Sequence, residues 1–310
     1  MKICVQNGGI IEHIGAEKCY ALIGQAGFQA IDWNLDHALP GSAIRSLQYE
    51  GSSILEQPLE AVIAHFAPEV DLIRQHGLTI SQAHAPFPAY VPGHPEVLEY
   101  MIGIYRRTIE LCHWAGCKNL VIHGISLSNS DRENTPETIE KLNYRLYEAL
   151  IPALLKCDVT VCLENLFTSD GGPVEGVCSD PHEAVRYIDA LNERAGREVF
   201  GFCLDVGHLQ LLGKNFRSYI PILGKRIKAL HIHDNDGRAD SHMAPLTGKV
   251  NWTFLCDSLR EIGYRGDLSF ETFMQARAAL FFDEELLLPW LTLIRRMGES
   301  FREKILQEQK

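Results

Sequence analysis

The chain alternates between short β-rich apolar runs and longer segments with helical spacing, and this alternation limits its fold more than any other feature. Predicted strands occur at 2–8, 28–34, 78–87, 119–126, 159–166, 199–208, 227–236 and 267–273. Each run is nearly continuous in apolar residues, which is typical of parallel strands buried on both faces. Eight such units within 310 residues favour an α/β fold with a single (β/α)8 TIM barrel.

The segments between the strands include four clear helices. We predict helices at 95–116, 136–156, 251–263 and 284–305. The first two carry Pro in their first turn and the third ends in Gly, as helix boundaries often do. The turn after the first strand, "QNGGIIEHIG", lacks the G-x-G-x-x-G spacing of a dinucleotide-binding sheet, so we expect no nucleotide cofactor.

One domain over residues 1–310 is the predicted organisation, with the active site at the C-terminal ends of the strands. Barrels of this length are routinely one domain, and neither a linker nor a low-complexity segment interrupts the pattern. The stretch 35–58 is long and contains Gly, Ser and Pro, so we predict a lid or rim over the barrel mouth.

Composition and charge limit the partners of the chain. The hydrophobic fraction of 46% is ordinary for a soluble globular protein, and the formal net charge of −11 disfavours a long phosphate backbone. Nine Cys without a C-x-x-C pair indicate a reducing compartment. Because we find no basic-then-apolar leader and no membrane-length apolar run, we predict a cytoplasmic protein without membrane partners. The oligomeric state stays open, a homo-oligomer included.

Polar residues with metal-binding or proton-carrying side chains gather at the C-terminal ends of the predicted strands. In a barrel these ends point toward the mouth, where chemistry occurs. The residues in question are Asp32, His84, His123, Glu164, Asn165, Asp205, His208, His231, His233 and Glu271.

Each of these residues also has a purely structural interpretation. A single buried His is more often a hydrogen-bonded core residue than a ligand, and Asp32 or Asp205 could cap a following helix. His233, Asp234 and Asp236 could form a solvated loop. The two glutamates fit this view least well, because a carboxylate that ends an apolar strand is costly to bury without a cation or a proton. The joint pattern therefore predicts a metal at the barrel mouth.

Several motifs in this order resemble the xylose isomerase-like TIM-barrel superfamily, which includes sugar phosphate isomerases and epimerases, inosose dehydratase and abasic-site nucleases of the endonuclease IV type (AP endonuclease family 2). The matching segments are "CLENL" with Glu164, "CLDVGH" with Asp205 and His208, "HIHDND" with His231, "DSHMAPLTGKVNW" with Asp240 and His242, and "SFETF" with Glu271. Any one of these motifs is weak evidence, but the ordered set covers almost the whole barrel.

The resemblance implies a ligand set. In ketose 3-epimerases and their relatives it assigns one divalent ion to Glu164, Asp205, His231 and Glu271, with His208 beside the substrate oxygens. The endonuclease IV pattern adds further positions that complete a three-zinc cluster, and they are occupied here by His84, His123, Asp240 and His242. The segment after His242, "APLTGKVNW", is more similar to the sugar isomerase-like proteins than to the nuclease.

The expected function is that of a divalent-metal-dependent isomerase or epimerase acting on a small ketose, aldose or polyol. Glu164 and Glu271 would transfer a proton next to a carbonyl through a metal-stabilised enediolate. Mn²⁺, Co²⁺, Mg²⁺ and Zn²⁺ all suit such ligands. The alternatives are an abasic-site nuclease, an inosose-type dehydratase and a non-catalytic barrel that uses its ion for folding or sugar sensing.

Loop and rim residues would determine specificity. The candidates for this role are Asp32, Trp33, Phe87, Asp170, Arg238 and Trp252. Arg238 could receive a phosphate or carboxylate, although a solvated loop cation is the commoner fate of such a residue. Because no Gly-rich phosphate cradle is found, a phosphorylated substrate is not favoured.

Overall fold

All eight predicted strands form in the computed structural model, which describes residues 1–307 of the chain. The strands are β1 (Ile3–Gln6), β2 (Ala30–Asn34), β3 (Thr79–His84), β4 (Asn119–Val121), β5 (Thr160–Glu164), β8 (Phe200–Asp205), β9 (Ile227–His231) and β10 (Leu268–Phe270). They follow the order β10-β1-β2-β3-β4-β5-β8-β9 in one sheet, and the registers of β1 with β10 and β2 and of β4 with β3 and β5 are parallel. The strand pattern predicted from the sequence is confirmed.

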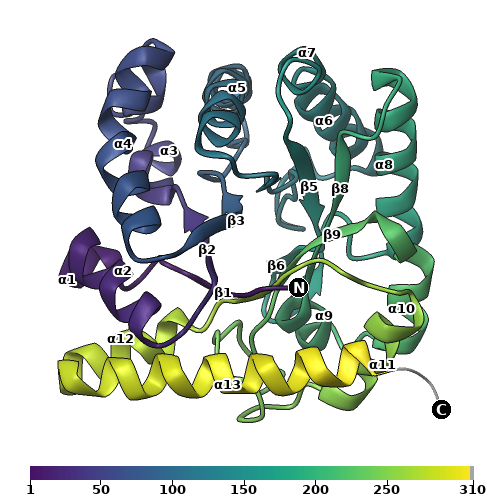
Figure 1. Cartoon of the computed structure of the whole chain (residues 1–310). Helices are drawn as coiled ribbons and strands as arrows, with labels where there is room; N and C mark the ends of the chain where they lie inside the picture. Colours follow the sequence, from purple (N-terminus) through teal and green to yellow (C-terminus); the bar gives the residue numbers. More distant parts are fainter. Residues whose placement is uncertain (308–310) are drawn as a thin grey trace. The chain divides into compact units, whose positions relative to one another are not determined.

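Contacts within the chain define two compact units, which are described separately (Figure 1). Unit 1 comprises Met1–Trp33, Asp71–Ser81 and the chain from Cys203 onward. Unit 2 comprises Asn34–Val70 and Gln82–Phe202. The predicted single-domain organisation stays a prediction.

Unit 1 contains β1, β9 and β10 together with the helices that follow them in the chain. Its helices are α1 (Ile11–Ile14), α2 (Ala16–Gln25), α9 (Val206–Leu211), α10 (Phe216–Leu223), α11 (Trp252–Glu261), α12 (Phe273–Phe282) and α13 (Leu287–Leu306). The long helix α13 contacts α2 and α11 as well as the strands (Figure 1). A Cβ at Gly298 would lie 2.7 Å from Ile3 and 2.8 Å from Phe270, so glycine permits this close approach of α13 to β1 and β10.

Unit 2 combines β4 and β5 with amphipathic helices and a small hairpin. Its helices are α3 (Gly41–Arg45), α4 (Leu59–Gln75, which ends in unit 1), α5 (Pro95–Ala115), α6 (Pro136–Glu148), α7 (Ile151–Leu154) and α8 (Pro181–Ala195). The antiparallel hairpin of β6 (Phe167–Ser169) and β7 (Pro173–Glu175) is absent from the sequence-based prediction. Its strands are too short for a periodic signal, and the turn relies on Gly171 with a positive φ of 76°.

Several predicted elements end earlier than the sequence suggested, among them the strands 119–126 and 227–236, which end at Val121 and His231. Two further differences have a clear physical cause. The predicted helix 136–156 is interrupted between α6 and α7, because Pro152 has no backbone N–H to continue the hydrogen-bond ladder. The predicted strand 199–208 ends at Asp205, whose side chain accepts a hydrogen bond from the His208 N–H and so caps α9.

The stretch 35–58 is ordered by short elements of its own. It contains two 3₁₀ turns, η1 (Asp36–Ala38) and η2 (Ile54–Glu56), on either side of α3. Ser53 and Glu56 form a capping box at η2, and the Ser53 hydroxyl donates to the Ala38 carbonyl at 2.7 Å. Its role as a lid or rim stays a prediction.

Candidate metal centre

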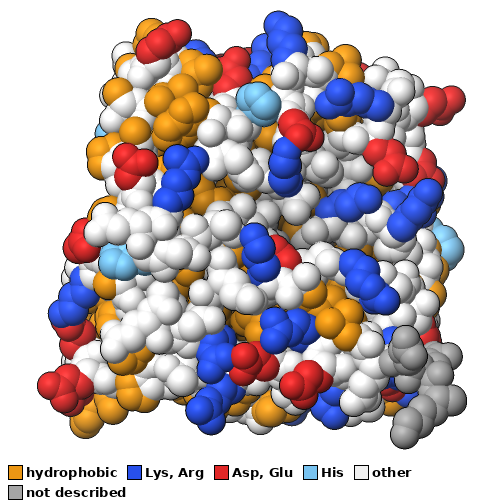
Figure 2. Space-filling view, viewed as in Figure 1, with side chains coloured by type: hydrophobic (Ala, Val, Ile, Leu, Met, Phe, Trp, Pro, Cys, Tyr) orange, Lys and Arg blue, Asp and Glu red, His pale blue; other side chains and the backbone are white. Residues whose placement is uncertain are grey.

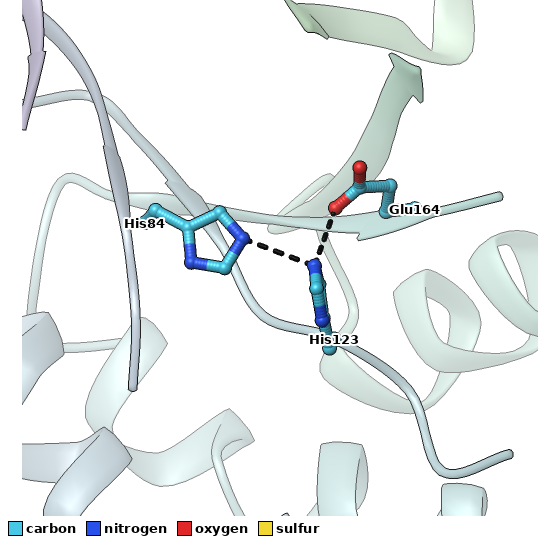
Figure 3. Close-up of side chains that lie close together, drawn as sticks. All are labelled: His84, His123 and Glu164. Carbon is cyan, nitrogen blue, oxygen red and sulfur yellow. Dashed lines mark hydrogen bonds and ion pairs between the residues drawn. The ribbon is translucent and has the colours of Figure 1, made fainter. Parts of the chain in front are cut away.

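Three polar side chains meet at strand ends in unit 2. His84 ends β3, His123 follows β4 and Glu164 ends β5. The His123 Nε2 atom lies 3.0 Å from His84 Nε2 and 2.9 Å from Glu164 Oε2 (Figure 3). We call these residues the unit 2 cluster. Three residues predicted from the sequence as site residues are thus brought together by β3, β4 and β5.

The backbone fixes the tautomer of His84. Its Nδ1 atom lies 2.9 Å from the carbonyl oxygen of Ala85, which only accepts hydrogen bonds, so Nδ1 carries the proton. The lone pair of Nε2 is then directed toward His123. Metal-bound histidines commonly donate their second ring N–H to a backbone carbonyl in this way. The arrangement therefore leaves Nε2 of His84 available to a cation.

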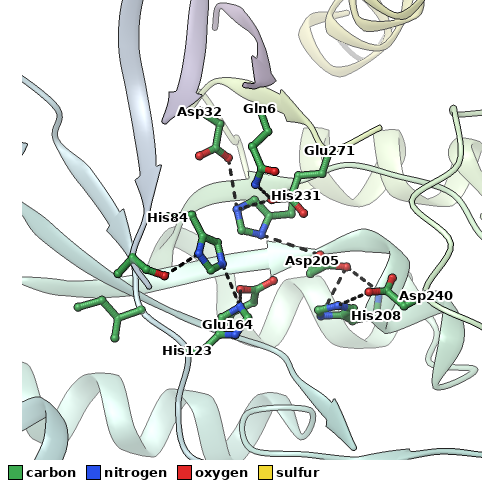
Figure 4. Close-up of polar contacts among 12 residues, drawn as sticks. Gln6, Asp32, His84, His123, Glu164, Asp205, His208, His231, Asp240 and Glu271 are labelled. Atoms are coloured by element: carbon green, nitrogen blue, oxygen red, sulfur yellow. Dashed lines mark hydrogen bonds and ion pairs between the residues drawn. The ribbon is translucent and has the colours of Figure 1, made fainter. Parts of the chain in front are cut away.

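A larger group of acids and histidines lies in unit 1, and we call it the unit 1 cluster. Its members are Asp32, Asp205, His208, His231, His233, Asp240, His242 and Glu271. Figure 4 shows Asp205 near its centre, between His231 on one side and His208 with Asp240 on the other. Arg238, also predicted as a site residue, is not among these members and lies exposed in the 234–243 loop. Its proposed substrate contact stays a prediction.

The two oxygens of Asp205 have different partners. Oδ1 accepts a hydrogen bond from the backbone N–H of His208 at 2.6 Å and so caps the N-terminus of α9. Oδ2 lies 3.1 Å from His233 Nε2 and 3.9 Å from His231 Nδ1. The capping role considered from the sequence is real, and it leaves Oδ2 directed at two imidazoles.

Carboxylates face both ring nitrogens of His231. Nε2 lies 3.4 Å from Asp32 Oδ2 and also 3.4 Å from Glu271 Oε1, whereas Nδ1 faces Asp205 (Figure 4). The side-chain amide of Gln6 donates to Glu271 Oε1. Gln6 was missed by the sequence analysis, although its position at the end of β1 matches that of the other strand-end residues.

Asp240 joins two histidines of the cluster. Its Oδ2 lies 3.0 Å from His242 Nε2 and 3.4 Å from His208 Nε2. Burial by itself would raise the pKa of this carboxyl, but hydrogen bonds from His208 and His242 outweigh it and hold the pKa well below its usual range. Asp240 is therefore an anion in the folded chain.

His233 is a cluster member, not part of a solvated loop as the sequence also allowed. It is fully buried, and its ring stacks on His242 with centroids 4.0 Å apart. A Cβ on Gly207 would lie 1.9 Å from this ring, so only glycine lets α9 pass His233. The "DVGH" and "HIHD" motifs thus depend on each other, which neither motif reveals alone.

Asp234 organises the loop that carries Asp240 and His242. Its buried carboxylate accepts the backbone N–H groups of Gly248 and Val250, at 2.9 and 3.0 Å, and the indole N–H of Trp252 at 3.2 Å. The solvated-loop interpretation was therefore wrong for Asp234 as well. Asp236 alone among the three is exposed.

The other rim candidates have varied environments. Trp33 is fully buried and so belongs to the core, which corrects its placement at the rim. Trp252 is nearly buried and bound to Asp234. Phe87 lies with its ring centroid 4.6 Å from that of His123, beside the unit 2 cluster. Asp170 accepts from Ser128 and Asn129 in a loop contact within unit 2.

Both clusters have donor atoms spaced as the ligands of a divalent ion would be. Two atoms that each lie about 2.1 Å from one ion are about 3.4 Å apart in a tetrahedral arrangement. One donor atom from each of Asp205, His208 and His233 lies within 4.8 Å of the others, and the same holds for His233, His242 and Glu271 and for the unit 2 cluster. Among residues 1–307, His233 Nδ1 and Asp240 Oδ1 are buried without a hydrogen-bond partner. These residues fit a divalent cation.

A separate hollow lies in unit 2, and we call it the unit 2 cavity. Its volume is about 510 Å³, and its lining includes Glu137, Glu140, Glu175, Glu183 and Arg186. The histidines of the unit 2 cluster are not part of that lining. Size alone therefore does not identify the place where chemistry occurs.

A parallel sheet of eight strands, with helices between them and ligand-type side chains at the strand ends, defines the class of TIM-barrel proteins with a site at the carboxyl ends of the strands. The sequence profile of the family described as "Xylose isomerase-like TIM barrel" matches residues 22–293. The chain belongs to this family, and the predicted fold class is confirmed.

Individual proteins agree with this assignment. The uncharacterized protein y4fM of Sinorhizobium fredii is 24% identical over 256 residues, which are 81% of this chain and 79% of that protein. The crystal structure of a D-tagatose 3-epimerase-like protein is similar with a TM-score of 0.69, at 20% identity, over 96% of this chain and 99% of that chain. That of an IOLI protein with a bound zinc atom has a TM-score of 0.68, at 18% identity, over 99% and 100%. At these identities the two structures establish a common fold.

No helix within residues 1–307 combines the length and apolar character required to cross a membrane. The cytoplasmic location stays a prediction.

Proposed function

We propose that the chain is a divalent-metal-dependent isomerase or epimerase of a small sugar or polyol. The observation that carries the proposal is the pair of buried glutamates, Glu164 and Glu271, which are 1% and 4% exposed and each lie beside an imidazole. Burying a carboxylate costs free energy, and proteins bury such groups where they bind a cation or transfer protons. The D-tagatose 3-epimerase-like structure with the same fold supports a sugar substrate.

The proposed ligands of the ion are Glu164, Asp205, His231 and Glu271, the set that the family resemblance implies. A bound divalent ion would supply Lewis acidity toward the carbonyl oxygen of a substrate. The bound zinc of the IOLI protein is consistent with such an ion, while Mn²⁺, Co²⁺ and Mg²⁺ suit the same donors. His208 is proposed to contact substrate oxygens.

The residues of the chain would carry the proton. One glutamate removes the proton from the carbon next to the substrate carbonyl, and the other returns a proton to the resulting enediolate. Gln6 donates to Oε1 of Glu271 and so limits the rotation of that carboxylate. On the other glutamate, Glu164 Oε2 lies 2.9 Å from His123 Nε2.

The test is exchange of a substrate α-proton with deuterium in D₂O, measured over a panel of ketoses with Mn²⁺, Co²⁺, Mg²⁺ or Zn²⁺ added. Glu164→Gln and Glu271→Gln should each reduce exchange by at least about a hundredfold, since general acid–base catalysis contributes on this order. Glu99→Gln serves as the matched control, because Glu99 pairs with Arg145 at the surface. Normal exchange in either active-site variant would contradict the two-base assignment.

A nuclease acting at abasic sites is the second candidate, because His84, His123, His208, Asp240 and His242 all lie in donor clusters. It predicts three bound ions and cleavage of an oligonucleotide that contains one abasic site. Against it, the formal net charge of −11 disfavours binding of a phosphate backbone. On the face in Figure 2, Lys and Arg side chains are interspersed with Asp and Glu. Metal counting together with the cleavage assay separates the two candidates.

The same assays can identify two further functions. Loss of water from a cyclic polyol ketone, seen by product analysis, would identify an inosose-type dehydratase. Loss of stability on chelation without any turnover would identify a non-catalytic barrel.

A further inference from the structure

We infer that Asp32 is a positioning residue that selects Nδ1 of His231 as the nitrogen facing the ion. The inference rests on the proposed function only in taking His231 as a ligand. Neither the family resemblance nor the motif pattern assigns Asp32 such a role.

The geometry around His231 distinguishes its two nitrogens. Two carboxylate oxygens, Asp32 Oδ2 and Glu271 Oε1, lie 3.4 Å from Nε2. The Asp205 carboxylate lies farther from the ring, with Oδ2 3.9 Å from Nδ1. All four residues are at most 4% exposed, so water screens these charges little.

This asymmetry determines the tautomer. A neutral imidazole carries its proton on one nitrogen and a lone pair on the other. Two anionic oxygens at Nε2 attract the positive end of an N–H bond and repel a lone pair, so they favour the Nε2–H tautomer. The lone pair of Nδ1 then points toward Asp205, and a histidine held by a carboxylate in this way is a common partner of a bound metal.

We assign the orientation of His231 to Asp32 and not to Glu271. Glu271 is itself a proposed ligand and receives the Gln6 amide at Oε1. Asp32 lies outside the proposed ligand set, is fully buried, and accepts the Ser269 hydroxyl at Oδ2 over 3.0 Å. Leu35, and not Asp32, occupies the N-cap position of the following 3₁₀ turn. Helix capping therefore does not explain why Asp32 is buried here.

The first experiment measures the tautomer directly. Nitrogen NMR of the metal-free full chain with ¹⁵N-labelled histidine reports which ring nitrogen carries the proton, and the His231 signals are assigned by their loss in His231→Gln. We expect the Nε2–H form in the unmodified chain and a growing share of Nδ1–H in Asp32→Asn. An Nδ1–H form or a doubly protonated ring in the unmodified chain near neutral pH would overturn the inference, whether or not the chain binds metal.

The second experiment measures Zn²⁺ affinity by competition with a chelator. Asp32→Asn should weaken the binding by about 10–100-fold, the usual effect of losing a residue that orients a metal-bound histidine. Ser269→Ala is the matched control, because it removes the hydroxyl that donates to the same carboxylate and should weaken binding far less. The unfolding midpoint of the metal-free variants shows whether a loss of affinity reflects a loss of structure.

The outcomes separate this inference from the proposed function. If the unmodified chain binds Zn²⁺, His231→Gln does not, and Asp32→Asn binds as tightly as the unmodified chain, the role of Asp32 is wrong while the metal site stands. If His231→Gln retains the full affinity for Zn²⁺, the proposed ligand set itself is wrong.

Discussion

The unit 1 cluster and the unit 2 cavity both gather carboxylates, but their carboxylates respond to burial in opposite ways. In the cluster, hydrogen bonds from His208 and His242 overcome burial and lower the pKa of Asp240. In the cavity, burial raises the pKa of Glu183, and the hydrogen bond from the Cys178 N–H only partly offsets it. An abundance of acids is common to both regions, whereas the pairing of acids with imidazoles occurs only in the first.

The difference explains why the unit 2 cavity is the weaker candidate for a metal site. Carboxylates that interleave with neutral imidazoles supply mixed oxygen and nitrogen ligands at the spacing of one coordination shell. Glutamates that line a cavity with a single arginine supply a negative surface without that geometry. Three predictions can break or sharpen this comparison.

The largest expected effect is on the affinity for the ion. His231→Gln should weaken Zn²⁺ binding by more than about a hundredfold, because His231 is a proposed ligand of the ion and not a group that orients one. Glu140→Gln, which alters the lining of the cavity, should leave the affinity unchanged. Isothermal titration of both variants provides the measurement. Equal losses in the two would mean that the cavity also binds the ion.

The next effect concerns the glycines that shape each region. Gly207→Ala places a Cβ 1.9 Å from the His233 ring and should destabilise the fold by about 3 kcal/mol or more, since that buried ring cannot move aside. Gly176→Ala in the cavity lining meets Leu166 O and Ser126 Oγ at 2.9 Å and should cost less.

Gly103→Ala is the control for the glycine variants, because nothing lies within 4 Å of its Cβ on α5, and it should stabilise by about 0.5–1 kcal/mol. Urea denaturation ranks the three variants. A Gly207→Ala protein as stable as Gly176→Ala would show that α9 can shift away from His233.

The smallest effects are on the pH dependence of stability, and they should have opposite signs in the two regions. Because the pKa of Asp240 is lowered on folding, its stabilisation is present above about pH 4 and is lost as the pH falls further. Asp240→Asn should therefore cost about 1–3 kcal/mol at pH 7 in the presence of a chelator, and the difference should shrink below about pH 4.

Because folding raises the pKa of Glu183, ionisation of this carboxyl destabilises the folded chain as the pH rises above about 4.3. Glu183→Gln should therefore stabilise at pH 7 by less than about 1 kcal/mol, and the gain should vanish under acid conditions. Chemical denaturation at pH 7 and pH 4 measures both variants. Shifts of the same sign would remove the contrast between the regions.

The strand pattern and many residues of the two clusters could be predicted from local sequence because their signals are local. Apolar runs of four to eight residues mark buried parallel strands, and residues such as His84, Glu164 and Glu271 follow those runs directly. Short elements escaped prediction: the β6–β7 hairpin has three-residue strands, and the break between α6 and α7 depends on where Pro152 falls in the hydrogen-bond ladder.

The sequence by itself determined the order of the strands and which of them end in a potential ligand, since both follow from periodicity and from the cost of burying charge. Only the tertiary structure decided that His233 stacks on His242, that Gly207 must lack a side chain to let α9 pass, and that Asp32 and Asp205 approach different nitrogens of His231. Those contacts join residues far apart along the chain, and the direction of a ring nitrogen depends on neighbours that no local pattern specifies.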